Sequence, residues 1–138
     1  MSSFQYPAPA GVAPPVAPYS AVVCAGETVY VSGQVGFDED RKLVGEEIRS
    51  QTRQTVANLE RCLQAAGCEL ADVIKISAFV AHRADVAAYN EVYAELFAAP
   101  YPARTTVVAG LSEGILVEIE AVAQVPPGSA DGGREGER

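Results

Sequence analysis

The chain has 138 residues, 49% of them hydrophobic, and a formal net charge of −8 from ten basic and eighteen acidic side chains. This length and composition predict one globular domain with a core of its own. The acidic balance disfavours nucleic acid and anionic membranes as partners, because both require a basic patch. Three cysteines without CxxC spacing and one histidine suggest neither a disulfide framework nor a metal site. Reduced thiols fit a cytosol best, so we expect a cytoplasmic protein. No apolar run approaches the roughly 18 residues of a membrane span.

The two ends differ in composition from the middle of the chain. Residues 1–18 hold five prolines among alanine and glycine, which favours an extended lead-in over a helix. Residues 126–138 alternate charges with glycine and offer little to pack, so we expect a disordered tail. The intervening residues 19–125 are predicted to form the folded domain.

The first half of that domain reads as a hairpin followed by a helix. Two short β-branched and aromatic runs, at residues 19–25 and 28–34, are separated by a Gly-Glu turn, which predicts a β-hairpin. A charged loop follows at residues 38–42. Apolar and small residues then recur every three or four positions over residues 48–66, ahead of Gly67, and predict an amphipathic helix of about five turns with a glycine cap.

The second half completes the order ββαβαββ. Residues 73–80 are apolar at nearly every position and predict a strand covered on both faces. A second amphipathic helix is expected over residues 86–97, and two strands over 104–109 and 116–125. The fold class is therefore α+β, a mixed β-sheet with two helices on one face. Two helices cover only one face of such a sheet, so we expect an oligomer in which another copy covers the second face.

Charged residues stand inside the last two predicted strands. An ionised side chain in a buried strand is costly unless it has a partner or a ligand. The two-residue period of a strand places Arg104 and Thr106 on one face, and likewise Glu118 and Glu120. If Val117 and its alternate neighbours face the helices, the carboxylates point toward the subunit interface. A structural salt bridge between Arg104 and either glutamate at the subunit interface is an equally good interpretation from spacing and burial alone.

Five segments carry a more specific pattern: Val31-Ser-Gly-Gln, Asp72-Val-Ile-Lys, Tyr89-Asn-x-x-Tyr, Tyr101-Pro-Ala-Arg-Thr and Val117-Glu-Ile-Glu-Ala-Val-Ala. In order and spacing they resemble the RidA (YjgF) family of enamine/imine deaminases, and the last two are the most specific. The resemblance implies a homotrimer of chorismate-mutase-like subunits (bacillus type) with active sites between subunits. It also implies hydrolysis of 2-imino or 2-enamino acids, such as 2-aminoacrylate, to a 2-oxo acid and ammonia without a cofactor.

The resemblance assigns roles to the two opposite charges. Arg104 binds the substrate carboxylate, a task that suits the planar, bidentate guanidinium. Glu118 orients and activates the attacking water, which requires a carboxylate able to accept and return a proton. Glu120 lies on the same face as Glu118, so physical reasoning alone does not separate the two as the acid/base.

Five further positions are carried over as substrate-binding residues, and they have simpler alternative interpretations. Tyr19 lines the family's cleft, or is an ordinary half-buried tyrosine. Ser32 and Gly33 lie beside the pocket, or the glycine merely allows a bend. Asn90 contacts the ligand, or makes a cap or a buried hydrogen bond. Thr106 contacts the substrate carboxylate or water, or is simply a good strand former.

Thr106 also marks a departure from the pattern, because many members of the family have cysteine there. The loop between Arg104 and Glu118 is one residue shorter than in common members. These differences indicate a divergent member whose substrate need not be 2-aminoacrylate. They are compatible with a role in one specialised catabolic or biosynthetic pathway, and the sequence leaves the substrate and the pathway open. A non-catalytic trimeric binder or chaperone-like protein that uses the same clefts is the alternative function.

Overall fold

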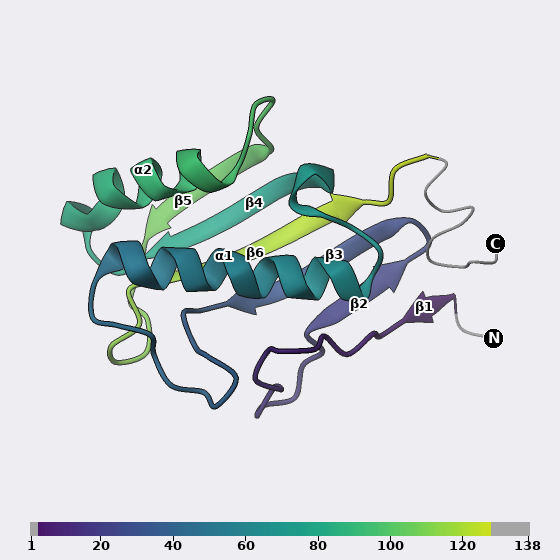
Figure 1. The fold of residues 1–138 in the computed structure, drawn as a ribbon, viewed down its shortest axis with the longest axis horizontal. Coiled ribbons are helices and arrows are strands. Elements are labelled where there is room, and N and C mark those ends of the chain that lie inside the picture. The colour runs from purple at the N-terminus through teal and green to yellow at the C-terminus, as the bar shows by residue number, and fades with distance from the viewer. Residues whose placement is uncertain (1–2, 128–138) are drawn as a thin grey trace.

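The computed structural model describes residues 3–127, which form one six-stranded sheet with two helices on one of its faces (Figure 1). In chain order the elements are β1 (Phe4–Gln5), β2 (Val22–Ala25), β3 (Thr28–Gln34), α1 (Ile48–Ala65), η1 (Leu70–Asp72), β4 (Val73–Val80), η2 (Arg83–Asp85), α2 (Val86–Leu96), β5 (Ala103–Val108) and β6 (Val117–Gln124). The strands are arranged β1-β2-β3-β6-β4-β5, with only β4 and β5 parallel. The predicted α+β class is confirmed, and β1 is an additional short strand ahead of ββαβαββ.

Helix α1 has the bounds and the buried stripe that its sequence predicts. Leu59 and Leu63 are both 0% exposed, in line with the three-and-four-residue spacing of its apolar positions. Gly67 follows the helix with φ +82°, and the N–H of Cys68 donates to the carbonyl of Leu63 at 2.9 Å. This left-handed glycine end is the capping motif expected at that position. No helix within residues 3–127 is long and apolar enough to cross a membrane.

Strand β6 lies in the middle of the sheet, and its side chains alternate between the two faces. Val117, Ile119 and Ala121 are 0%, 0% and 3% exposed and pack beneath the helices. Glu118 and Glu120 alternate with them and therefore point to the opposite face. The predicted direction of the two carboxylates, away from the helices, is confirmed by this burial pattern.

The face that carries these carboxylates is open in the single chain. Both helices of residues 3–127 lie on the other side of the sheet (Figure 1). Apolar side chains remain on the open face, with Tyr30 49% and Val107 41% exposed and Phe79 half-buried. Within one chain β4 is covered by the helices on one face only, and the cover of its second face by another copy stays a prediction.

The proline-rich lead-in is held against the domain at several points. β1 pairs antiparallel with β2 at the edge of the sheet. The guanidinium of Arg41 donates to the carbonyl of Pro14. Arg61, on α1, lies against Gly11, where an added Cβ would come within 2.9 Å of its Cζ. The tail predicted for residues 126–138 falls, from residue 128 on, outside the described residues.

Candidate active site

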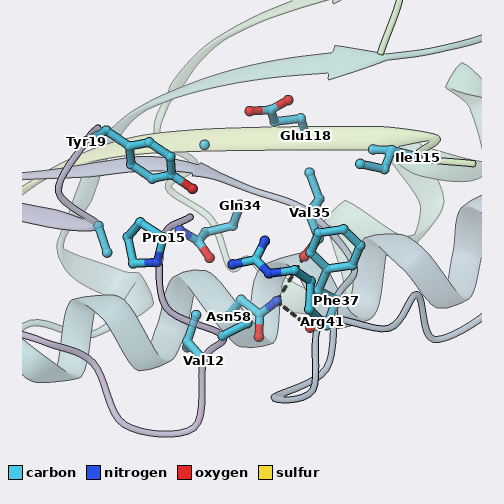
Figure 2. Close-up of a pocket in the computed structure, with 13 residues that line it drawn as sticks. Val12, Pro15, Tyr19, Gln34, Val35, Phe37, Arg41, Asn58, Ile115 and Glu118 are labelled. Atoms are coloured by element: carbon cyan, nitrogen blue, oxygen red, sulfur yellow. Dashed lines mark hydrogen bonds between the residues drawn. The ribbon is translucent and has the colours of Figure 1, made fainter. Parts of the chain in front are cut away.

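A cavity of about 180 Å³ opens beside β6 and β3, and we call it the Glu118 cavity (Figure 2). Its lining includes Tyr19, Gly33, Phe37, Arg41, Asn58 and Glu118. Figure 2 shows the Glu118 carboxylate and the Tyr19 ring at its rim. At about 30 Å³ per water, the cavity has room for roughly six waters, which suits a small metabolite.

Gly33 makes room for the Glu118 carboxylate. The pairing of β3 with β6 shifts by one residue between Val31 and Gln34, so Ser32 and Gly33 form a β-bulge. A Cβ on Gly33 would overlap Oε2 of Glu118 and lie 3.0 Å from its Cδ. The glycine therefore sits in a bend and also supplies the space into which the carboxylate fits.

Ser32 positions the chain segment that carries Tyr19. Its hydroxyl donates to the carbonyl of Ser20 at 2.6 Å, and its backbone N–H donates to the carbonyl of Ala21 at 2.9 Å. Tyr19 itself is 50% exposed at the rim of the cavity. The Ser32 hydroxyl is thus engaged in fixing residues 19–21, while Tyr19 is free to contact a ligand.

The environment of Glu118 favours its protonated form. Burial raises the pKa of this half-buried carboxyl above its ordinary value of 4.5, and the negative charge of Glu120 raises the pKa further. Glu120 is exposed and is not part of the cavity lining. Of the two carboxylates on this face, Glu118 alone combines a place in the cavity with a raised pKa, the condition that suits an acid/base at neutral pH.

Arg104 lies on edge strand β5, against the aromatic face of α2. Its Cζ is 4.6 Å from the ring centroid of Tyr93 and 5.5 Å from that of Tyr89, both distances being typical of cation–π contacts. The expectation that Arg104 occupies a buried strand is wrong for this chain, since β5 pairs only with β4 and Arg104 is exposed. Asn90, one residue after Tyr89, is also exposed, which contradicts the buried hydrogen bond considered for it.

Three buried hydroxyls surround this arginine. Within residues 3–127, the hydroxyls of Tyr89, Tyr93 and Thr106 meet no partner with hydrogen-bond geometry, although Arg104 and Thr106 lie close enough to the Tyr89 hydroxyl to lower its pKa. Burial raises the pKa of Tyr89 to about 12, against an opposing effect of Arg104, and burial also raises the pKa of Tyr93. Both tyrosines are therefore neutral donors at physiological pH. Unpaired buried hydroxyls are costly, so the group is suited to accept an oxygen-bearing ligand.

Arg104 and Glu118 lie on opposite faces of the sheet. Arg104 is level with Ile76, which is fully buried under the helices, whereas Glu118 is level with Phe79 on the open face. Strand spacing places the two Cα atoms roughly 14 Å apart. No ion pair within residues 3–127 joins Arg104 to Glu118 or Glu120, because the two ion pairs found there join α1 to α2. The salt bridge considered for Arg104 therefore does not form within one chain, and at a subunit interface it stays a prediction.

The predicted site residues thus form two clusters. One contains Tyr19, Ser32, Gly33 and Glu118, and the other contains Asn90, Arg104 and Thr106. The chain does not bring the two clusters together.

Sequence reasoning missed Arg41, which belongs to the Glu118 cavity. The residue stands in the charged loop 38–42, where its side chain reads as solvated. Its backbone has φ +62°, a conformation that glycine or asparagine ordinarily occupies, so the residue type gives no signal of the turn. No group of three or more His, Cys, Asp and Glu side chains in the described part of the chain is placed to hold a metal ion.

Comparisons with known sequences identify relatives that cover most of this chain. The sequence model of the Endoribonuclease L-PSP family matches residues 10–125. A RutC family protein of Pyrococcus horikoshii is 41% identical over 111 residues, which are 79% of this chain and 88% of that protein. The 2-iminobutanoate/2-iminopropanoate deaminase of Dermatophagoides farinae is 39% identical over 110 residues, 78% of this chain and 86% of the relative.

A solved structure extends the likeness to the fold. The crystal structure of RidA from an Antarctic Psychrobacter species superposes with a TM-score of 0.82 at 38% identity, covering 87% of this chain and 98% of that one. The chain belongs to the Endoribonuclease L-PSP family, that of the RidA (YjgF) proteins, as its motifs indicate.

Proposed function

We propose that the protein is a cofactor-independent deaminase that hydrolyses 2-imino or 2-enamino acids to 2-oxo acids and ammonia. The observation that carries this proposal is the pair of complementary clusters, a carboxylate with a raised pKa in one and an arginine beside buried hydroxyls in the other. Relatives from mite and human that cover most of the chain are named 2-iminobutanoate/2-iminopropanoate deaminase, which supports the same reaction class.

We propose further that the site forms between copies of the chain in a homotrimer. Glu118 and Arg104 face away from each other in one chain, so one small substrate meets both only if they come from different copies. A head-to-tail contact repeated three times closes a ring with one such site at each interface. The apolar side chains of the open face, among them Tyr30 and Val107, would be buried at the same time.

The chemistry requires a carboxylate anchor and one proton carrier. Arg104 of one copy binds the substrate carboxylate through two parallel hydrogen bonds and fixes the imine carbon near Glu118 of the other. Glu118 takes a proton from water as the water oxygen bonds to the imine carbon and the C=N double bond becomes single. Glu118 returns this proton to nitrogen, which gives a carbinolamine. It then moves the proton of the new hydroxyl group to the amino nitrogen, so that the C–N bond breaks, ammonia leaves and the carbonyl forms. An enamino acid enters the same route once it has tautomerised to the imine.

The placement of the two glutamates supports Glu118 as the acid/base. Glu118 lines the cavity, and its carboxylate fits into the space left by Gly33. Glu120 is exposed, and its charge acts on Glu118 by raising the pKa of that carboxyl. We therefore assign proton transfer to Glu118 and an electrostatic influence to Glu120.

Two other functions fit less well. RNA cleavage, which the family's description names, requires binding to a polyanion, and a chain of net charge −8 is poorly suited to this. A non-catalytic trimeric binder needs an anion anchor such as Arg104. It has no use for a half-buried carboxylate with a raised pKa, which costs stability at neutral pH.

The test is hydrolysis of 2-iminopropanoate made in situ from alanine by an amino-acid oxidase, with pyruvate release followed by lactate dehydrogenase. We expect acceleration above the spontaneous rate, with losses of about 100-fold or more for Glu118→Gln and for Arg104→Ala. Glu120→Gln serves as the matched carboxylate control and is expected to retain activity. A wild-type protein that does not accelerate release, or a Glu118→Gln variant as fast as wild type, would refute the proposal.

A further inference from the structure

Arg41 occupies a strained backbone conformation beside the proposed site. It is the one non-glycine residue among residues 3–127 with a positive φ, at +62°. A side chain with a Cβ makes this left-handed conformation less stable than ordinary right-handed backbone. Such a conformation persists only where the surrounding structure holds it, and it is a reason to look for function.

The turn that carries Arg41 is rigid. The Asp38 carboxylate accepts hydrogen bonds from the backbone N–H groups of Asp40 at 2.8 Å and Lys42 at 3.0 Å. The N–H of Arg41 donates to the Asp38 carbonyl at 3.0 Å, and the N–H of Asp38 donates to the Lys42 carbonyl at 2.8 Å. The loop that reads as a solvated charge cluster is therefore a closed turn that fixes the direction of the arginine side chain.

The side chain of Arg41 is also held along its length. Its Cζ lies 5.5 Å from the centroid of the Phe37 ring, and the guanidinium donates to the Pro14 carbonyl. Asn58, 3% exposed on α1, donates to the carbonyls of Val35 and Phe37, each at 2.9 Å, and so fixes the chain beneath that ring (Figure 2). The guanidinium is therefore placed before any ligand arrives.

This guanidinium lies in the Glu118 cavity without a carboxylate of its own. Arg41 and Glu118 both line this cavity, and Figure 2 shows Gln34 beside the guanidinium and the Glu118 carboxylate on the far side of β6. No carboxylate within residues 3–127 lies within 4.0 Å of it. One hydrogen bond to Pro14 leaves most of its five N–H donors available. A half-buried arginine with free donors in a cavity of this size is suited to bind an anionic group.

We infer that Arg41 recognises a second acidic group on the substrate, so that the preferred substrates are 2-imino or 2-enamino acids with a carboxylate at the far end. In the proposed site, Arg104 of one copy holds the carboxylate next to the imine carbon, and Glu118 acts on that carbon. Arg41, on the same chain as Glu118, is then left to face the other end of the ligand. This substrate class rests on the proposed deaminase activity, and the experiment below separates the two.

The competing role for Arg41 is to fasten the lead-in through Pro14. Arg61 provides the control for that role, because it also packs against the lead-in, at Gly11, yet it does not line the cavity. Arg41→Gly is the informative variant, since glycine adopts φ +62° without strain and the turn keeps its Asp38 hydrogen bonds. A change in its specificity is therefore not explained by a misfolded loop.

The experiment compares two four-carbon imines that differ at the far end, iminosuccinate from aspartate and 2-iminobutanoate from 2-aminobutanoate, each made in situ by an oxidase. Release of the 2-oxo acid gives the ratio of the two kcat/KM values for wild type, Arg41→Gly, Arg41→Lys and Arg61→Ala. Calorimetric titration of the full chain with oxaloacetate and with 2-oxobutanoate gives the corresponding ratio of binding constants.

We expect wild type to favour the diacid, and Arg41→Gly to lower the kcat/KM ratio about 10- to 100-fold, the range for loss of a charge-assisted hydrogen bond. Arg41→Lys should fall between the two, and Arg61→Ala should keep the wild-type ratio. A wild type with no preference for either diacid, or a fall that Arg61→Ala shares equally, overturns the inference. If wild type accelerates neither imine but binds oxaloacetate through Arg41, the deaminase proposal fails and the diacid assignment stands.

Discussion

Gly33 and Glu118 meet across the bulge between β3 and β6, where the glycine leaves the space that the carboxylate fills. A methyl group on Gly33 would overlap Oε2 of Glu118 and lie 3.1 Å from its Cγ. The overlapping atom is at the flexible end of a side chain, so the carboxylate swings aside more easily than the backbone moves. The position of the proposed acid/base therefore depends on the absence of a side chain one strand away.

Replacement of Gly33 by alanine should separate catalysis from folding. We expect Gly33→Ala to lower kcat by about 10- to 100-fold, because a displacement of about 1 Å misplaces the acid/base, while the melting temperature changes little. Gly110→Ala is the matched control, since an added Cβ there meets nothing within 4 Å. Equal kcat values for Gly33→Ala and wild type would mean that the carboxylate position seen here is not the catalytic one.

Glu120 should control the pH dependence of catalysis. The charge of Glu120 raises the pKa of Glu118, and a general base must be deprotonated to act. Glu120→Gln should therefore shift the acid limb of the kcat/KM profile to lower pH while activity is retained.

A charge-removing control for this shift is Glu27→Gln, in the exposed turn between β2 and β3, at the opposite end of β3 from Gly33. It should leave the profile in place. An unmoved acid limb in Glu120→Gln would show that the two carboxylates do not interact in the working enzyme.

Glu118 should cost stability at neutral pH. Its folded-state pKa lies above the ordinary 4.5, so the stabilising protonated form is fully present below that value and is lost as pH rises through the raised pKa. Relative to Glu118→Gln, wild type should lose free energy of unfolding between acidic and neutral pH. Urea unfolding of both proteins at one fixed concentration, at several pH values, measures the difference. A difference that grows in favour of wild type as pH rises would mean that a cation lowers the pKa instead.

Thr106 should serve the ligand and not the fold. Its buried hydroxyl has no partner within the described residues, so Thr106→Val should leave the free energy of unfolding unchanged or raise it by about 1 kcal/mol. If the hydroxyl contacts substrate, kcat/KM falls about tenfold in the same variant. Thr105→Val tests the other face, where Thr105 accepts a hydrogen bond from Lys75 at 3.2 Å. A stability loss with unchanged kcat/KM in Thr106→Val would make the residue a structural one.

Much of the fold could be predicted because its elements pack against one surface each. Helix α1 buries a continuous stripe of side chains, and β6 alternates between buried and less buried side chains. Both burial patterns follow the spacing of apolar residues in the sequence. The position of Glu118 on the face away from the helices followed from the same alternation.

The relation between Arg104 and Glu118 could not be predicted in this way. The two-residue period says which residues of one strand share a face of the sheet. It does not say which residues of a second strand point to that same face. That depends on β5 pairing in parallel with β4 at the sheet edge. The place of Arg41 in the cavity could not be predicted for a different reason. Its positive φ depends on the hydrogen bonds that Asp38 makes, and arginine is not a residue type that indicates such a turn.

The central claim is that each site takes Glu118 from one copy of the chain and Arg104 from another. Glu118→Gln and Arg104→Ala, each inactive alone, should be unfolded together and refolded in equal amounts, with the two separately refolded proteins as the control. Random assembly gives about a quarter of the sites both intact residues, so about a quarter of wild-type deaminase activity should return. If Glu118 and Arg104 act within one chain, every chain lacks one of them, and a mixture as inactive as its components would contradict the account.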